Sequence, residues 1–184
     1  ETVVRVGTSL RLSAQRHGCV SSHQKKALAS LTAWSEQLER EMIAKIKAQS
    51  DWAKTYGLLT GICGIGPITG VALTNLFSRI DFANSDAAVA FCGPDPRPNE
   101  SGRKVGRRRL SKQGDKAART LLYNAASSAA RTAQFKDYYA TLRARGLAST
   151  AALVIIARKL LRIAYGVWRT GQPFDPEKLR PATA

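Results

Sequence analysis

The residues best equipped for chemistry lie in the segment NESGRKVGRRRLSKQGDKAART, which occupies positions 99–120. Residues 97–119, called the basic segment below, contain nine lysines and arginines but only two acids. Such a segment can neutralise several phosphates of a nucleic acid. A hydroxyl held against a phosphate can also attack it, which makes Ser101 a candidate nucleophile. Because a lone Ser101-Gly102 pair is a weak motif, composition by itself favours an electrostatic loop.

A serine hydroxyl is a poor nucleophile unless a base or a metal ion activates it. The 13 acids of the chain are scattered, and no pair of them is spaced to hold Mg²⁺. The two histidines and three cysteines show no zinc-ligand spacing, and no Ser-His-Asp arrangement is evident. We therefore expect no metal site and no cofactor in this chain, and no activity as a two-metal nuclease.

The composition indicates a folded domain with a polyanionic partner. Of the 184 residues, 44% are hydrophobic, which is enough to bury a core, and the formal net charge is +16. Nucleic acid is the expected partner, although a ribosomal or membrane-surface protein would carry a similar charge. The longest apolar run, residues 151–157, is too short to cross a bilayer, so no membrane role is expected. The cysteines are expected to be reduced thiols of a cytoplasmic protein.

The glycine-rich stretch LLTGICGIGPITGVALTNLF, residues 58–77, predicts two helices joined by a tight turn. Gly64 and Gly66 permit the turn, and Pro67 suits the first position of the next helix. The N-terminus of that helix would offer N–H donors to a phosphate, which predicts a helix-hairpin-helix in contact with nucleic acid. The predicted contact residues are Gly64, Ile65, Gly66 and Thr69. A plain interhelix turn is the alternative, and the glycine spacing fits neither a dinucleotide fingerprint nor a P-loop.

Residues 23–56 contain no proline or glycine and are rich in strong helix formers, so they predict one long helix. Apolar side chains recur along it at steps of three and four, at Ala27, Leu31, Trp34, Leu38, Met42 and Ile46. This stripe either packs on the rest of the same chain or belongs to a coiled-coil or hairpin arm. We expect such an arm to join copies into a homo-oligomer, with dimer and tetramer both open.

No β-strand pattern stands out, so the predicted class is all-α. A long helical or coiled-coil arm is expected to precede a compact helical domain with the helix-hairpin-helix. Further helices are predicted at residues 81–92, 116–132, 135–145 and 150–169. Asn84 or Ser85 is the expected N-cap of the first of these, and Ser149 that of the last. Three prolines within residues 94–98 predict a loop over residues 93–102.

These elements predict a division of the chain into four parts. They are a tail or truncated helix (1–22), the arm (23–56), the domain with the helix-hairpin-helix (57–170) and a terminal tail (171–184). Because the chain begins at Glu1 in the middle of a pattern, we also expect it to be a fragment of a longer protein.

Three stretches follow one another along the chain: GIGPITGVAL, DFANSDAAVAFCGPDP and NESGRKVGRRRLSKQGDKAARTLLYNAA. Over residues 23–170 the chain resembles the C-terminal domain of the bacterial insertion-sequence transposase family 110/116/902, which includes the pilin-gene invertase. In that family a helix-hairpin-helix precedes a Phe-containing helix, a Gly-Leu-x-Pro loop, a Ser-Gly, a Ser-Lys-x-Gly and an Arg-x-x-Leu helix. The matching residues are Gly64, Gly66, Phe82, Gly93, Pro96, Ser101, Gly102, Ser111, Lys112, Gly114, Arg119 and Leu122. One departure is Gly93-Pro94-Asp95-Pro96 in place of Gly-Leu-x-Pro.

The resemblance implies a mechanism. Full family members carry an acidic RNase H-like domain that binds Mg²⁺, and a serine of the C-terminal domain attacks DNA to form a phosphoserine intermediate. On this sequence the nucleophile would be Ser101, whereas Ser111-Lys112 more resembles a helix entry with a phosphate contact. The expected nucleic-acid contacts of the basic segment are Arg103, Lys104, Arg107, Arg108, Arg109, Lys112, Lys116 and Arg119. The resemblance also implies DNA as partner and, for some members, an element-encoded guide RNA.

Three hypotheses follow for the function. The first is the DNA-binding, nucleophile-bearing domain of a transposase or site-specific recombinase, which is catalytically incomplete without its acidic domain. The second is a non-enzymatic helix-hairpin-helix module that binds nucleic acid and dimerises through residues 23–56. The third is a repair-type junction-binding protein that forms no covalent adduct.

Overall fold

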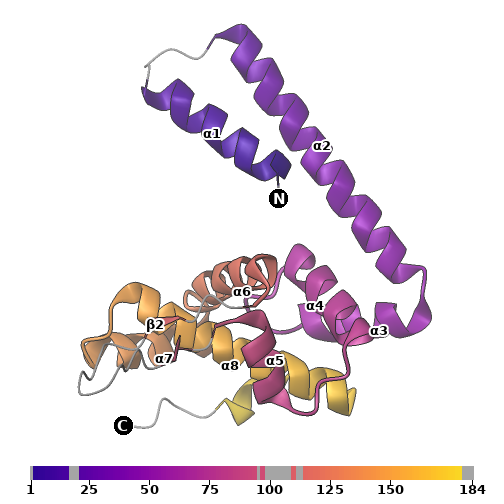
Figure 1. Ribbon diagram of the computed structural model, residues 1–184, viewed down its shortest axis with the longest axis vertical. Coiled ribbons are helices and arrows are strands. Elements are labelled where there is room, and N and C mark those ends of the chain that lie inside the picture. The colour runs from indigo at the N-terminus through magenta and orange to yellow at the C-terminus, as the bar shows by residue number, and fades with distance from the viewer. Residues whose placement is uncertain (1, 17–20, 95, 98–108, 111–113, 180–184) are drawn as a thin grey trace. The chain divides into compact units, whose positions relative to one another are not determined.

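The computed structural model describes residues 2–16, 21–94, 96–97, 109–110 and 114–179 (Figure 1). The chain divides into two compact units, residues 1–45 and 46–184. Helices dominate both units, and the predicted all-α class is confirmed. Within the described residues the sheet structure is limited to β1 (Pro96–Arg97) and β2 (Arg109–Leu110), which pair antiparallel.

The first unit consists of α1 (Thr2–Arg16) and most of α2 (Ser22–Lys47). A capping box starts α2, because the Ser21 N–H donates to Gln24 Oε1 and the Gln24 N–H donates to Ser21 Oγ. Side chains of both helices line a shallow cleft, so α1 lies along α2. Further along α2 the apolar side chains of Trp34, Leu38 and Met42 are exposed. The predicted oligomeric arm stays a prediction.

The prediction of one uninterrupted helix over residues 23–56 is wrong. The helix α2 ends at Lys47, and α3 (Ser50–Thr60) begins after Gln49, whose backbone is extended at φ −110° and ψ 122°. No proline or glycine marks this break. The signal for it is Ser50-Asp51, since residues of these types favour the first turn of a helix, where Asp51 meets the positive end of the dipole.

The core of the second unit forms around α8 (Ser149–Thr170), which contacts each of the helices α3 to α7. These are α3, α4 (Pro67–Arg79), α5 (Ser85–Cys92), α6 (Lys116–Ala129) and α7 (Ala133–Ala144), and a short 3₁₀ turn at Pro176–Lys178 follows α8. Apolar residues at helical spacing along α8 face this core: Leu153, Ile156, Leu160 and Val167 are buried and Ile163 is partly buried. No helix among the described residues is long and apolar enough to cross a membrane.

Aromatic side chains and ion pairs hold α4 and α5 against α8. Phe77 stacks on Trp168 with ring centroids 4.9 Å apart. The Tyr165 hydroxyl donates to the Phe82 carbonyl at 3.0 Å, and Asp86 pairs with Arg162. The N-cap of α5 is Asn84, one of the two predicted residues, which accepts from the Ala87 N–H at 2.8 Å.

The predicted cap of α8 needs correction. Ala148 occupies the N-cap position and provides no side-chain cap, while Ser149 is the first helical residue. The Ser149 hydroxyl lies 2.9 Å from the Tyr139 hydroxyl of α7 instead. A tertiary contact has therefore replaced the local capping bond that the sequence pattern favoured.

Candidate nucleic-acid interface

The turn between α3 and α4 is built by glycine and proline as the sequence predicts. Gly64 adopts a left-handed φ of 87°, and Gly66 is an extended N-cap with Pro67 at the first helical position. No side chain caps this helix start, and the first internal bond runs from the Gly70 N–H to the Gly66 carbonyl at 2.8 Å. The N–H groups of the first turn of α4 are therefore left for an outside acceptor. The identification as a helix-hairpin-helix stays a prediction.

Gly64 also sets how closely this turn approaches α6. A Cβ at position 64 would lie 2.6 Å from the Ala125 carbonyl oxygen and 2.6 Å from the Ala129 Cβ. Only glycine facing small residues allows this approach. The buried alanines Ala125 and Ala129 of α6 provide that surface.

An open cleft of about 380 Å³, called the turn cleft below, lies between this turn and α6. Its lining includes all four contact residues predicted for the turn: Gly64, Ile65, Gly66 and Thr69. Ile65 is 4% exposed and belongs to the core, so it can meet a ligand only through its backbone. The opposite wall is formed by Asn124, Ala125 and Ser128 of α6.

The sequence reasoning missed Asn124 and Ser128. The available signal was a polar pair one helical turn apart in an otherwise Ala-rich stretch, YNAASSAA. That signal indicates only a polar face on a helix. The contact of Gly64 with α6 places this polar face beside the α3–α4 turn.

Much of the basic segment lies outside the described residues. This applies to Ser101 and Ser111 and to the predicted contacts Arg103, Lys104, Arg107, Arg108 and Lys112. Of the remaining predicted contacts, Arg109 lies in β2 and Lys116 and Arg119 lie in α6. The pairing of Arg97 with Arg109 brings these two cations of the segment side by side.

The C-terminal part of the basic segment, from Gly114 onward, is fixed to the end of α5. Gly114 has a φ of 123°, and a Cβ there would lie 2.5 Å from the Phe91 carbonyl oxygen. That same oxygen accepts from the Asp115 N–H at 3.1 Å. The Asp115 carboxylate in turn caps α6 by accepting from the N–H groups of Ala117 and Ala118. Lys116 and Arg119 are thereby held on a rigid helix start.

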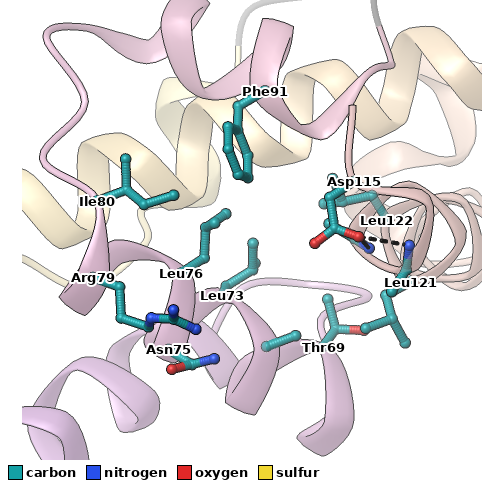
Figure 2. A pocket seen from close by; sticks show the side chains of 13 residues that line it. Thr69, Leu73, Asn75, Leu76, Arg79, Ile80, Phe91, Asp115, Leu121 and Leu122 are labelled. Carbon is teal, nitrogen blue, oxygen red and sulfur yellow. Dashed lines mark hydrogen bonds between the residues drawn. The ribbon is translucent and has the colours of Figure 1, made fainter. Parts of the chain in front are cut away.

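A second, apolar cleft of about 310 Å³ separates α4 from the ends of α5 and α6 (Figure 2). Leu73, Leu76 and Phe91 line it, and Asp115 lies at one edge, where it bonds the α6 backbone (Figure 2). Nearby, burial and then the charge of Asp115 raise the pKa of Cys92 to about 12. This cysteine is therefore a neutral core side chain and not a nucleophile.

Arg119 has an unusual environment for a predicted phosphate contact. Its Nη1 atom is enclosed, and no hydrogen-bond partner for it exists within the described part of the chain. The side chain lines a small cleft of about 250 Å³ with Pro94, Tyr123 and Val154. A buried cationic donor without an acceptor is unfavourable, so an anionic group at this point would be bound strongly.

Residues 56–140, which run from α3 into α7, match the family model described as Transposase IS116/IS110/IS902 family. These residues are similar to that family and are called the transposase-family domain below, after the model that they match. The chain is 26% identical over 121 residues to the insertion element IS116 uncharacterized 44.8 kDa protein of Streptomyces clavuligerus, across 65% of this chain and 30% of that protein. It is 28% identical over 152 residues to the pilin gene-inverting proteins of Moraxella bovis and Moraxella lacunata, across 77% of this chain and 46% of each.

These comparisons confirm the resemblance inferred from the sequence. The chain spans less than half the length of each of these relatives. The turn cleft and the whole basic segment lie inside the matched residues 56–140, whereas α1 and α2 lie outside them.

The described residues of the transposase-family domain do not fit a Mg²⁺ ion. No group of three or more His, Cys, Asp or Glu side chains in that part of the chain is arranged to hold a metal. The turn cleft is lined by hydroxyl, amide and backbone groups with no carboxylate. Its chemistry therefore suits an anion such as a phosphate and not a divalent cation.

Proposed function

We propose that the transposase-family domain binds DNA as part of an enzyme that cuts and rejoins DNA. The family match supports a role in DNA transposition or inversion. The observation that carries the proposal is the basic segment, which lies within the matched residues. Within it Arg97 pairs with Arg109, and Gly114 and Asp115 fix the start of α6, with Lys116 and Arg119, to the end of α5. Cations held at fixed positions can orient a phosphodiester for reaction.

Ser101 is the nucleophile in this proposal. Its Oγ attacks a phosphorus atom of DNA, the bond from phosphorus to the leaving oxygen breaks, and a phosphoserine and a free DNA hydroxyl result. A DNA hydroxyl later attacks the phosphoserine, which restores the serine and rejoins the strand. The enclosed donor of Arg119 and the cations of the basic segment stabilise the charge on the attacked phosphate.

The chain by itself is proposed to be catalytically incomplete. A serine needs a base or a metal to accept its proton, and the described residues supply no metal cluster. An acidic domain of the parent protein, carrying Mg²⁺, would supply this activation. An element-encoded guide RNA and a second copy of the chain are further proposed partners.

A covalent-trapping experiment tests the nucleophile. The chain, joined to its acidic N-terminal domain, is incubated with Mg²⁺, element-end DNA labelled on either side of the crossover, and candidate element RNA. Protein–DNA adducts that survive denaturation are compared among wild type, Ser101→Ala and Ser111→Ala. We expect the adduct to disappear only with Ser101→Ala. Loss only with Ser111→Ala would keep the mechanism and move the nucleophile.

A non-enzymatic binding and dimerisation module is the second candidate. The exposed apolar side chains of α2 favour it, since Trp34 is 52% exposed in the structure and is costly to leave in water. An absence of adduct in all three proteins, with DNA binding intact, would select this module if a related active recombinase gives an adduct under the same conditions. Trp34→Glu should then dissociate the oligomer in sedimentation experiments, whereas Ala33→Glu on the neighbouring helix position should not.

A further inference from the structure

A cleft of about 250 Å³ lies between α6, α8 and the turn that follows α5. It is called the Tyr123 cleft below and is lined by Pro94, Arg119, Thr120, Tyr123, Val154 and Ala157. The proposed mechanism uses only Arg119 of this set, so the rest of the cleft has no assigned role.

Apolar groups on rigid elements form most of the walls of the Tyr123 cleft. Pro94 is buried and follows Gly93, whose N–H closes the end of α5. On α8, Val154 and Ala157 lie three residues apart and therefore share one face of the helix. Because none of the side chains of Pro94, Val154 and Ala157 can form a hydrogen bond, these walls favour an apolar surface on the ligand.

The helix α6 adds an aromatic ring and a cation to the cleft. Tyr123 is partly buried and stands one helical turn after Arg119. Arg119 is the only charged residue in the described lining, and its enclosed Nη1 atom has no hydrogen-bond partner among the described residues. The Thr120 hydroxyl is already bonded, since it donates to the Lys116 carbonyl at 2.9 Å. The cleft thus presents one charged donor beside an aromatic ring.

A single kind of ligand meets both requirements of the Tyr123 cleft. A phosphate by itself would pair with Arg119 but would leave the apolar walls in water. An apolar side chain of a partner protein would cover the walls but would leave Arg119 enclosed without an acceptor. A nucleotide taken out of a stacked strand supplies both groups, because its phosphate is an acceptor and its base has faces that stack on aromatic rings.

We propose that the Tyr123 cleft binds one unstacked nucleotide of a DNA strand. The base packs on the Tyr123 ring and the apolar walls, and Arg119 donates to the phosphate of the same nucleotide. This inference rests on the proposed cutting and rejoining of DNA, and it deepens that function by naming the form of the strand that the domain takes. Cutting and exchange of strands unpair DNA near the crossover, and a base that is already unpaired costs less to take out of the stack.

Fluorescence anisotropy of the full chain with two labelled single strands of equal length tests the inference. One strand consists of thymidines, and the other has the same sugar-phosphate backbone without bases, so the two strands carry equal charge. The wild-type chain should bind the thymidine strand about tenfold more tightly, because one base stacks in the cleft. A uridine RNA strand and a paired DNA duplex complete the set of probes.

Two substitutions of Tyr123 separate stacking from a loss of folding. Tyr123→Leu keeps an apolar side chain but removes the ring, so it should weaken binding to the thymidine strand about tenfold and change binding to the strand without bases by less than about twofold. Tyr123→Phe should bind both strands as wild type does. Tyr139→Leu makes the same change at a partly buried tyrosine of α7, outside the cleft, and should have little effect on either strand.

The salt dependence separates the base contact from the phosphate contact. Arg119→Ala should weaken binding to both strands and reduce the slope of affinity against salt by about 0.7, since one phosphate contact on a single strand is lost. Tyr123→Leu should keep the wild-type slope, because it changes no charge.

Three results would overturn the inference. If Tyr123→Leu binds the thymidine strand as wild type does, or weakens binding to both strands equally, the cleft holds no base, and DNA binding that Arg119→Ala weakens would leave the proposed function standing. A dependence on Tyr123 that is seen only with the uridine RNA would assign the cleft to RNA in place of DNA. If the wild-type chain binds none of the DNA probes, the inference and the proposed function both fail.

Discussion

Gly64 is the residue on which the shape of the turn cleft most depends. It combines a left-handed φ of 87° with a contact to α6 in which any Cβ would lie 2.6 Å from Ala125 and Ala129. The left-handed backbone and the close contact with α6 would each favour glycine at position 64. The cleft therefore exists because one residue in the turn has no side chain.

Gly64→Ala should lower the free energy of unfolding by about 2–4 kcal/mol, since it adds backbone strain and overpacking. Chemical denaturation measures this change. Gly57→Ala is the matched control, because a Cβ at this exposed position inside α3 meets nothing within 4 Å. It should raise the free energy of unfolding by about 0.5–1 kcal/mol. Equal effects of the two substitutions would contradict the geometry of the turn.

Burial of the Cys92 thiol should make the stability of the fold decrease at alkaline pH. Burial raises its pKa from 9.0 to about 12, so the folded chain keeps the thiol proton after the unfolded chain has lost it. Stability should therefore be fully present below pH 9.0 and fall as the pH rises toward 12. Melting temperatures of wild type and Cys92→Ala across this range isolate the contribution, and the variant should show the smaller decline. Parallel declines would remove Cys92 as the cause.

At the scale of elements, α6 has two roles, one at its start and one on its exposed face. Its start holds Lys116 and Arg119, the last two cations of the basic segment, and its exposed face forms one wall of the turn cleft. Asp115 makes this possible, because its carboxylate caps the helix while its N–H bonds to the Phe91 carbonyl of α5. An acid is thus retained at the edge of a strongly basic segment for a structural reason.

Asp115→Ala should cost about 1 kcal/mol of stability through loss of the cap. Asp115→Asn should keep stability close to that of wild type, since asparagine caps equally well. It should also raise DNA affinity about twofold to fivefold by removing a negative charge beside the phosphates. Thermal unfolding and anisotropy titrations check the pair, and lower DNA affinity in Asp115→Asn would show that the carboxylate itself is needed for binding.

At the scale of the whole molecule, the core and the proposed interface belong to one unit. The continuous core cluster extends from Leu59 to Val167, inside residues 46–184. The exposed apolar side chains Trp34, Leu38 and Met42 belong to the other unit. From this division we expect nucleic-acid binding to need only residues 46–184, and any self-association to need residues 1–45.

A chain limited to residues 46–184 should therefore unfold cooperatively and keep DNA affinity within about twofold of the full chain, because it retains the core and the cations of the basic segment. It should be monomeric in sedimentation experiments if the full chain is an oligomer. Circular dichroism and anisotropy complete the comparison. A truncated chain that is unfolded, or that still self-associates, would contradict this assignment.

The sequence by itself determined most of the local structure. Helix-forming composition, the Asn84 cap, Pro67 at the start of α4 and the apolar period of α8 all depend on residues close together in the chain. These signals predicted the all-α class and helices near their observed positions. The order of motifs, together with the basic segment, also indicated the resemblance to the transposase family.

Only the tertiary structure decided how these helices meet. The bond of Ser149 to Tyr139 went against the local capping pattern, because a long-range contact outweighed a small difference in capping preference. The pairing of Thr69 with Asn124 and Ser128 across one cleft depends on Gly64 touching Ala125 and Ala129, which lie far away in sequence. A contact between residues so far apart leaves no pattern in the local sequence. The polar face of α6 therefore lies beside the α3–α4 turn only in the folded chain.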